Sequence, residues 1–146
     1  MCGRFYRYLL WRNNASIGSI QIATKVMEYK ITLALDTLIA DLGEEEAVDF
    51  VRFALPRLNE RRELLHTLLG QGDWKAAASL AHKTLSSVRV YDDGSLEAAL
   101  LTVERQAVAE ISQAAFQQDL QDTFKRVLAG VEAWLETIER NRLNSP

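Results

Sequence analysis

The chain has 146 residues, enough for one domain with a substantial core. Its 48% apolar and 25% charged residues and net charge of −3 suit a globular domain and lack the basic excess typical of nucleic-acid binders. No run approaches the ~18 apolar residues of a membrane span, and a lone cysteine, Cys2, fits a reducing compartment. We therefore expect a cytoplasmic protein that binds neither membrane nor nucleic acid.

Residues 1–26 differ in composition from the rest of the chain. They carry four basic and no acidic groups, whereas the remainder holds 13 basic and 20 acidic groups. We expect them to form a leader that is weakly ordered or outside the core, with 27–146 as the single domain; alternatively, Met27 is the functional start. The opening MCGRF resembles the start of the SRAP family, which uses its second-position cysteine to link DNA, but the rest of that family's pattern is absent.

The first two predicted helices meet at a glycine. A short helix over about Ile31 to Leu42 is expected to end at Gly43, in the manner of a C-terminal glycine cap. Three glutamates after Gly43 suit the positive end of a second helix, which runs to about Leu69 and which Pro56 should kink. One side of this second helix is apolar: Val48, Val51, Leu55, Leu58, Leu65 and Leu69.

A third helix follows Gly72, with Asp73 as its predicted N-cap, and ends at the turn Asp92-Asp93-Gly94-Ser95. We interpret Asp92 and Asp93 as turn and cap residues rather than as a catalytic carboxylate pair. The predicted core stripe of this helix is Trp74, Ala77, Leu80, Ala81, Leu85 and Val88.

Two further helices complete the predicted fold. The fourth carries a stripe of Leu96, Leu100, Val103 and Ala107. The last, about Gln113 to Arg140, carries a seam of Leu120, Phe124, Val127, Val131, Trp134 and Ile138, and the tail from Asn141 is expected to fray. No strand-like alternation appears. The pattern favours an all-α, antiparallel four-helix bundle with a short additional N-terminal helix.

His82 lies on the polar side of the third predicted helix. Helical spacing places four small or cationic residues on the same face and Lys83 about a quarter turn away; the four are Lys75, Ser79, Ser86 and Arg89. This arrangement predicts that the imidazole is exposed on a rigid helix and is available to react. A solvated histidine with no role would show the same pattern.

Several of these elements together resemble the histidine-containing phosphotransfer (HPt) domain family. They are Phe50 or Phe53 with Leu55-Pro56, the Gly72-Asp73 turn, the Ala81-His82 pair, Leu96 about fourteen residues beyond the histidine, and the closing helix LQDTFKRVLAGVEAWL. The resemblance covers about Ile31 to Ile138. It implies that His82 is a phosphoacceptor in a two-component phosphorelay and that the fold is an HPt-like four-helix bundle.

The resemblance also implies the reaction and the partners. His82 would accept a phosphoryl group from an aspartate of a response-regulator receiver domain and return it, linking that domain to a sensor or hybrid histidine kinase. The receiver would bring the divalent metal, so we expect no cofactor in this chain. It has no nucleotide-binding loop, which indicates a phosphocarrier and not an enzyme with its own ATP site. With one docking face we expect a monomer.

The chain departs from the family at two positions. The lysine and glycine that commonly follow the histidine at i+3 and i+4 are here Leu85 and Ser86. Lys75, Lys83 and Arg89 are the cations that could stabilise a phosphoryl group instead, and Ser79 and Ser86 leave room for a partner. The loss of the lysine keeps an alternative open, a degenerate HPt-like module that docks a receiver or kinase without being phosphorylated.

The sequence gives no functional role to the other histidine and no evidence of a metal site. His66 lies near a helix C-terminus, where a partly protonated imidazole suits the dipole, and we expect no chemistry there. Two histidines sixteen residues apart and one cysteine offer no metal-ligand spacing, so we predict no metal site.

Overall fold

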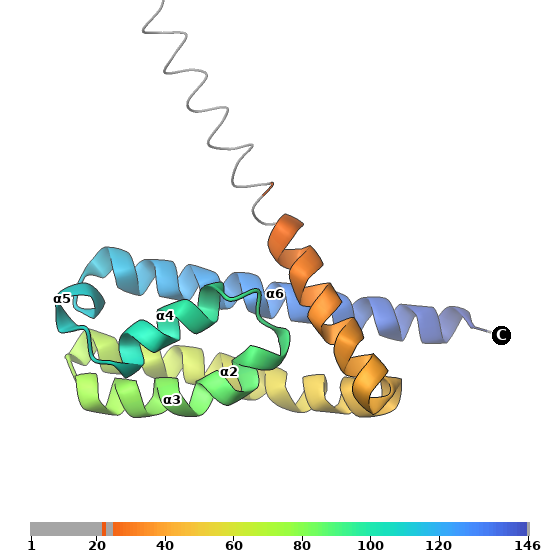
Figure 1. The fold of residues 1–146 in the computed structure, drawn as a ribbon, viewed down its shortest axis with the longest axis horizontal. Helices are drawn as coiled ribbons and strands as arrows, with labels where there is room; N and C mark the ends of the chain where they lie inside the picture. Colours follow the sequence, from red (N-terminus) through yellow and green to blue (C-terminus); the bar gives the residue numbers. More distant parts are fainter. Residues whose placement is uncertain (1–21, 23–24, 146) are drawn as a thin grey trace, which may run out of the picture.

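The computed structural model of the protein describes residue 22 and residues 25–145, and within these it contains six helices and no strand (Figure 1). Residues 25–42 form an N-terminal helix. It is followed by α2 (Glu44–Gln71), α3 (Trp74–Tyr91), α4 (Ser95–Glu104), α5 (Val108–Ile111) and α6 (Ala114–Asn144). The predicted all-α class is therefore confirmed, while the expectation for the leader concerns residues that lie almost entirely outside the described part.

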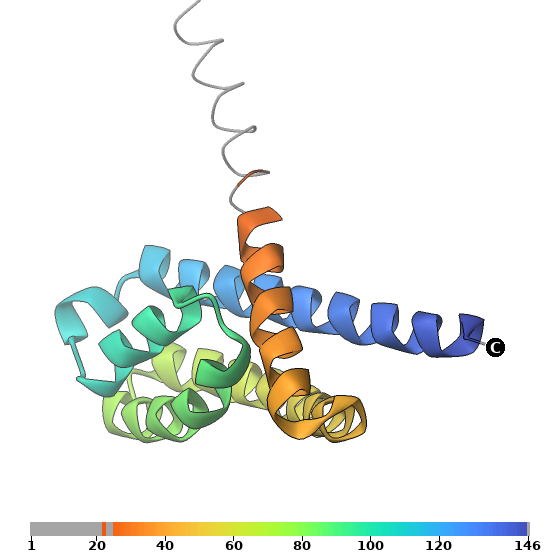
Figure 2. The ribbon, with the colours of Figure 1, turned by 45° about the vertical axis from the view of Figure 1, so that its right-hand side comes forward.

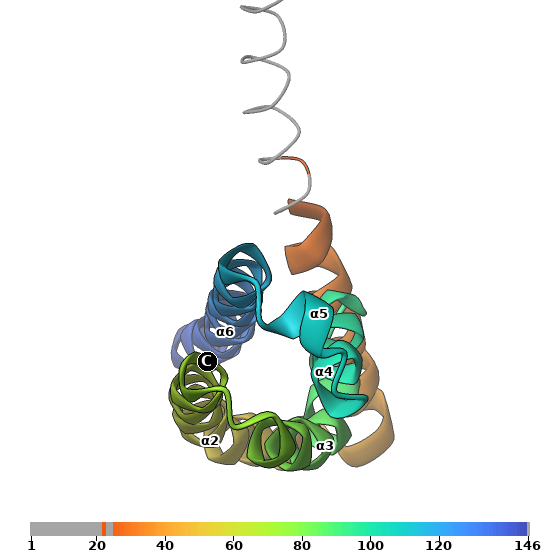
Figure 3. The same cartoon turned by 90° about the vertical axis from the view of Figure 1, so that its left-hand side faces the viewer.

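The long helices surround a common core. The α2 helix packs on α3 and α6, and α4 packs on the same two helices from the opposite side, as the end-on view shows (Figure 3). The short α5 helix links α4 to α6 at one end. The N-terminal helix runs across the others instead of alongside them (Figures 1 and 2). None of the described helices combines the length and the hydropathy that crossing a bilayer requires.

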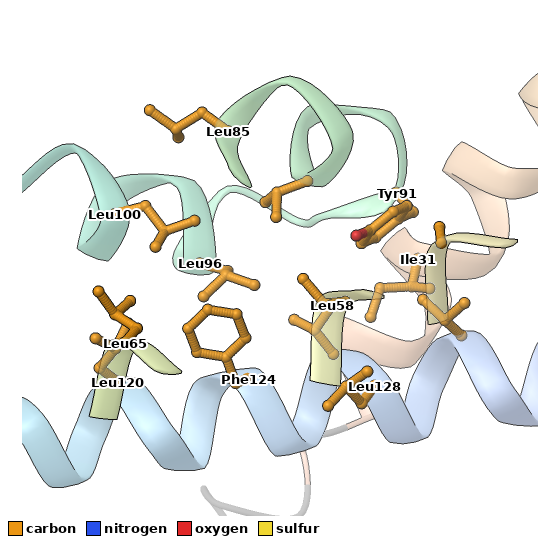
Figure 4. Packing of buried hydrophobic residues seen from close by; sticks show 14 of the residues in the cluster. Ile31, Leu58, Leu65, Leu85, Tyr91, Leu96, Leu100, Leu120, Phe124 and Leu128 are labelled. Carbon is orange, nitrogen blue, oxygen red and sulfur yellow. The ribbon is translucent and has the colours of Figure 1, made fainter. Parts of the chain in front are cut away.

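The predicted apolar stripes supply most of the core. Phe124 of α6 is fully buried and lies near Leu65 of α2 and Leu96 of α4, which are buried as well (Figure 4). Burying a large apolar side chain contributes about 1.5–3 kcal/mol, so this contact between three helices is a main source of stability. Trp134, on the same seam of α6, is also buried.

Caps mark the helix boundaries where the sequence predicts them. Gly43 has a φ of +90°, and its N–H donates to the carbonyl of Ile39 at 2.7 Å. The side chain of Asp73 accepts from the N–H of Ala76 at 3.2 Å and so caps α3. Gly72, in the left-handed region, closes α2 just before it.

Two predicted boundaries were wrong because tertiary contacts extend the helices. The N-terminal helix is already helical at residue 25, not 31, and Met27 from its first turns is buried in the core. At the other end, α6 continues to Asn144 instead of fraying from Asn141. There Arg142 donates to Glu44 at 2.7 Å, which ties the last turns of α6 to the start of α2.

The predicted fourth helix was wrong at its end. It stops at Glu104, so Ala107 is not part of its stripe but precedes α5, which the sequence reading missed. Gln106 adopts a φ of +54°, and its N–H donates to Val103 while that of Ala107 donates to Thr102. This is the hydrogen-bond pattern of a left-handed C-terminal cap, which glycine usually provides.

Candidate functional site

His82 lies in the middle of α3 with its side chain 74% exposed. The residues expected to share or border its face are all exposed too: Lys75, Ser79, Lys83, Ser86 and Arg89. The opposite side of the helix is buried through Ala77, Ala81 and Val88. The helix is thus anchored in the core along one side, and it presents the imidazole to solvent from a fixed backbone.

Glu104 holds the imidazole. Its Oε1 lies 2.8 Å from Nδ1 of His82, although the two residues are far apart in the sequence and belong to different helices. An ionised carboxylate only accepts hydrogen bonds, so Nδ1 carries the proton and donates it. The neutral ring then has its lone pair on Nε2, which has no hydrogen-bond partner among the described residues. The pair orients the ring and leaves a nucleophilic nitrogen directed away from Glu104.

An ion pair closer to the turn shows how the hairpin of α3 and α4 positions this contact. Nε of Arg89 donates to Oε1 of Glu97 at 2.8 Å. Arg89 lies seven residues after His82, and Glu97 lies seven residues before Glu104. The two contacts therefore follow the same antiparallel register of α3 and α4, and they lie two turns apart on each helix. Sequence reasoning missed Glu104, yet its distance from the Asp92–Ser95 turn, matching that of His82, is a signal that could have found it.

The turn between the two helices is held by its aspartates. Oδ2 of Asp92 accepts from the N–H of Glu97 at 2.8 Å, and Oδ1 of Asp93 accepts from the N–H and the hydroxyl of Ser95 at 3.0 and 2.6 Å. The turn-and-cap interpretation is thus confirmed. Burial raises the pKa of Asp92, whereas the hydrogen bonds from Ser95 outweigh burial and lower the pKa of Asp93. A rigid turn fixes the register on which the His82–Glu104 contact depends.

The basic side chains near His82 differ in whether they form an ion pair. Arg89 is engaged by Glu97, whereas none of the ion pairs in the described part of the chain involves Lys75 or Lys83. Lys83 is exposed and adjacent to His82 in sequence. Leu85 is only 2% exposed and packs in the core, as its place on the helix predicts, so it cannot reach a group bound to the imidazole.

A shallow hollow of about 160 Å³ lies between α2 and α3, beside Ser86. Ser86 lies one turn after His82 on the exposed face of α3. On the α2 side the hollow is lined by the exposed Phe53, whose ring stacks under the guanidinium of Arg57 at 4.0 Å, and by Arg61. Arg61 also donates to the backbone carbonyl of Lys83 at 3.2 Å. A hollow lined by an aromatic ring and guanidinium groups therefore lies next to the face of α3 that carries His82.

Comparison of the chain with protein-family models, with curated proteins and with solved structures finds no match. The described residues contain no group of three or more His, Cys, Asp or Glu side chains arranged to hold a metal. His66 is exposed on α2 and forms no hydrogen bond or ion pair with the described residues. His82 is thus the histidine that the fold both exposes and orients.

Proposed function

We propose that this protein is a histidine phosphocarrier of the HPt type, in which His82 accepts a phosphoryl group from an aspartate of a receiver domain and passes it on. The observation that carries the proposal is the exposed imidazole held through Nδ1 by Glu104 at 2.8 Å. Exposed pairs of this kind also occur on surfaces without a function. In a nucleophilic histidine the pair has a use, because the free nitrogen must carry its lone pair and point at the incoming phosphorus.

The proposed transfer uses one nitrogen and one carboxylate. The lone pair of His82 Nε2 attacks the phosphorus of the receiver's aspartyl phosphate. The N–P bond forms, the P–O bond to the aspartate breaks, and its electron pair returns to the leaving carboxylate. The ring gains positive charge, which the carboxylate of Glu104 offsets through the Nδ1–H hydrogen bond. The reverse reaction returns the phosphoryl group to a second aspartate.

The surroundings of His82 support a carrier role. A phosphorylated side chain gains roughly −1.5 to −2 charge, so cations that can move toward it stabilise the product. Lys83 and Lys75 are exposed and outside the ion pairs described above, whereas Arg89 would have to leave Glu97. Ser79 and Ser86 flank the ring with small side chains and keep the approach open. The helices α2, α3, α4 and α6 would form the HPt-like four-helix bundle that fixes these positions.

The proposal also assigns the partners. The receiver domain would bring the divalent metal and the acidic pocket, and a sensor or hybrid histidine kinase would supply the phosphoryl group. The hollow beside Ser86, with Phe53 and the guanidinium groups of Arg57 and Arg61, lies where a docked receiver would touch α2.

Phosphotransfer profiling tests the proposal. The chain is incubated with a panel of phosphorylated receiver domains, and acid-labile, base-stable label on the chain is measured. We expect His82→Gln to abolish labelling and the matched control His66→Gln to retain it, with equal helix content by circular dichroism. Label that persists in His82→Gln would contradict the assignment of the site.

A second candidate function is a degenerate module that docks a receiver or kinase without accepting phosphate. The burial of Leu85 in place of the family lysine and the engagement of Arg89 by Glu97 favour it. Binding of a receiver that is unchanged by His82→Gln, with no labelling by any receiver in the panel, would select this function over the carrier.

A further inference from the structure

The arginines of α2 fall into two groups. Arg52 and Arg62 each form an ion pair, with a glutamate of α6 at 2.7 Å and with a glutamate of α2 at 3.6 Å. Arg57 and Arg61 instead line the hollow between α2 and α3, and none of the ion pairs in the described part of the chain involves either of them. The hollow therefore carries two positive charges that are not paired with the carboxylates of the described residues.

Neutral groups hold these two arginines in place. The guanidinium of Arg57 stacks on the ring of Phe53 at 4.0 Å, and Nη1 of Arg61 donates to the backbone carbonyl of Lys83 at 3.2 Å. Neither a ring nor a carbonyl cancels the charge, and each guanidinium has five N–H donors, of which Arg61 uses one in this contact. Because Phe53 belongs to α2 and Lys83 to α3, the two guanidiniums are held toward different elements. This arrangement suits two separate carboxylates better than one phosphate group.

The hollow has room for one apolar side chain. Its volume is about 160 Å³, smaller than the roughly 300–1,000 Å³ of small-molecule pockets and close to the roughly 150 Å³ cavity that holds a benzene ring in an engineered protein. Two of its lining residues, Ala54 and Leu58, are buried, whereas Phe53 is 60% exposed. An exposed aromatic ring beside buried apolar residues leaves apolar surface for a partner to cover.

We propose that the hollow binds an acidic peptide segment of a partner protein, in which one large apolar side chain lies between two carboxylates. The apolar side chain covers Phe53, and the carboxylates pair with Arg57 and Arg61, whose forked guanidinium groups match carboxylate geometry. This binding goes beyond the proposed phosphotransfer and does not depend on His82. Because the hollow adjoins the face that carries His82, a bound segment and a receiver docked on that face would compete.

The small size of the site limits its affinity. One apolar side chain anchors the segment, and ion pairs at an exposed rim contribute little each and are screened by salt. We expect a Kd of about 0.1–1 mM for a short peptide at low salt, and a higher Kd at high salt.

Nitrogen-15 NMR titration of the full chain tests the proposal, with the synthetic peptide Asp-Glu-Leu-Glu-Asp as the probe. We expect the amide signals of Phe53, Arg57 and Ser86 to shift. Two control peptides should bind several-fold more weakly: Asn-Gln-Leu-Gln-Asn removes the charges, and Asp-Glu-Ala-Glu-Asp removes the apolar anchor. Equal binding of either control peptide, or no shift at the hollow up to about 5 mM probe, overturns the proposal.

Variants of the chain test the two arginines. Arg57→Gln with Arg61→Gln should raise the Kd of the probe several-fold. Arg126→Gln with Arg140→Gln is the matched control, because both residues are exposed on α6, lie outside the hollow and remove the same charge. Circular dichroism checks folding, and Arg57→Gln alone keeps the Arg61–Lys83 contact should the double variant lose stability. Equal weakening by the α6 variant would show unspecific attraction and would overturn the site.

Other occupants of the hollow give different results. If a phosphate group is the true ligand, a peptide with one phosphoserine and no acidic residue binds more tightly than the probe. If a second copy of the chain covers the hollow, the same amide signals shift when the chain alone is concentrated. Either result overturns the acidic segment as the occupant.

Discussion

The imidazole of His82 and the carboxylate of Glu104 meet at 2.8 Å across the α3–α4 hairpin, in the same register as Arg89 and Glu97. One pair orients the imidazole of His82, and the other ties the hairpin together close to its turn. The register depends on the capped turn between them, in which Asp92 and Asp93 bind the first N–H groups of α4. Local capping thus determines the geometry of a site nearly three helical turns away.

Replacing Glu104 should slow transfer without removing the phosphoacceptor. Glu104→Gln keeps an acceptor for Nδ1–H but loses the charge that offsets the developing imidazolium. We expect a decrease of about 10–100-fold in the transfer rate from a phosphorylated receiver, by analogy with the loss of carboxylates that orient metal-bound histidines.

The control is Glu97→Gln, which breaks the neighbouring pair of the same hairpin and should leave the rate within a few-fold of the unmodified chain. Nitrogen-15 NMR of the ring should show the Nδ1–H tautomer of neutral His82 in the unmodified chain. A dominant Nε2–H tautomer would contradict the role given to Glu104.

Lys83 should matter more than Arg89 for holding the phosphoryl group. Arg89 is engaged by Glu97, so moving it to the phosphoryl group costs an ion pair, whereas Lys83 is exposed beside His82. We expect Lys83→Ala to slow transfer several-fold and Arg89→Ala to change it less, measured with the same receiver. If Arg89→Ala has the larger effect, Arg89 plays the part that the HPt resemblance would give to a lysine at position 85.

The sequence predicted the face of α3 because helical periodicity is local. The burial of Leu85 and the exposure of His82 and Ser86 follow from spacing along one helix. The sequence did not predict the Arg61–Lys83 contact, because it depends on how α2 and α3 pack rather than on either helix alone. Nor did it predict the end of α4, because Gln106 adopts a conformation that glycine or asparagine usually signals. A contact between helices can be predicted only where a short turn fixes the register, as at Glu104, and even there it was missed.

Asp92 should make the domain more stable as the pH falls. Burial raises the pKa of this carboxyl, so the folded state binds a proton more readily than the unfolded state does. Stability therefore decreases as pH rises from the ordinary value of 3.8 through the raised pKa. Asp92→Asn removes this penalty and can still accept from the N–H of Glu97. We expect the variant to be the more stable protein at pH 7 and its advantage to shrink as pH falls toward 3.8, in urea unfolding at several pH values.

Asp93 provides the opposite control. Its pKa is lowered by the hydrogen bonds from Ser95, so its contribution to stability is present above the ordinary value of 3.8 and is lost as pH falls through the folded pKa. Asp93→Asn should therefore be destabilising at pH 7 and less so in acid. Parallel pH dependences for the two variants would contradict the assignment.

Gly130 should be required for the approach of the N-terminal helix to α6. A methyl group at this position would lie 2.8 Å from Cδ1 of the fully buried Ile31, closer than carbon atoms pack. Overpacking costs about 1–3 kcal/mol and the higher helix propensity of alanine returns up to about 1 kcal/mol, so we expect Gly130→Ala to destabilise the domain by up to about 2 kcal/mol. Gly70→Ala is the matched control, since nothing lies within 4 Å of the added methyl group, and there the higher helix propensity of alanine should stabilise α2.

Adding Ile31→Val removes Cδ1 and should recover part of the loss in Gly130→Ala. In a double-mutant cycle by urea unfolding, a coupling energy near zero would show that the two residues do not touch.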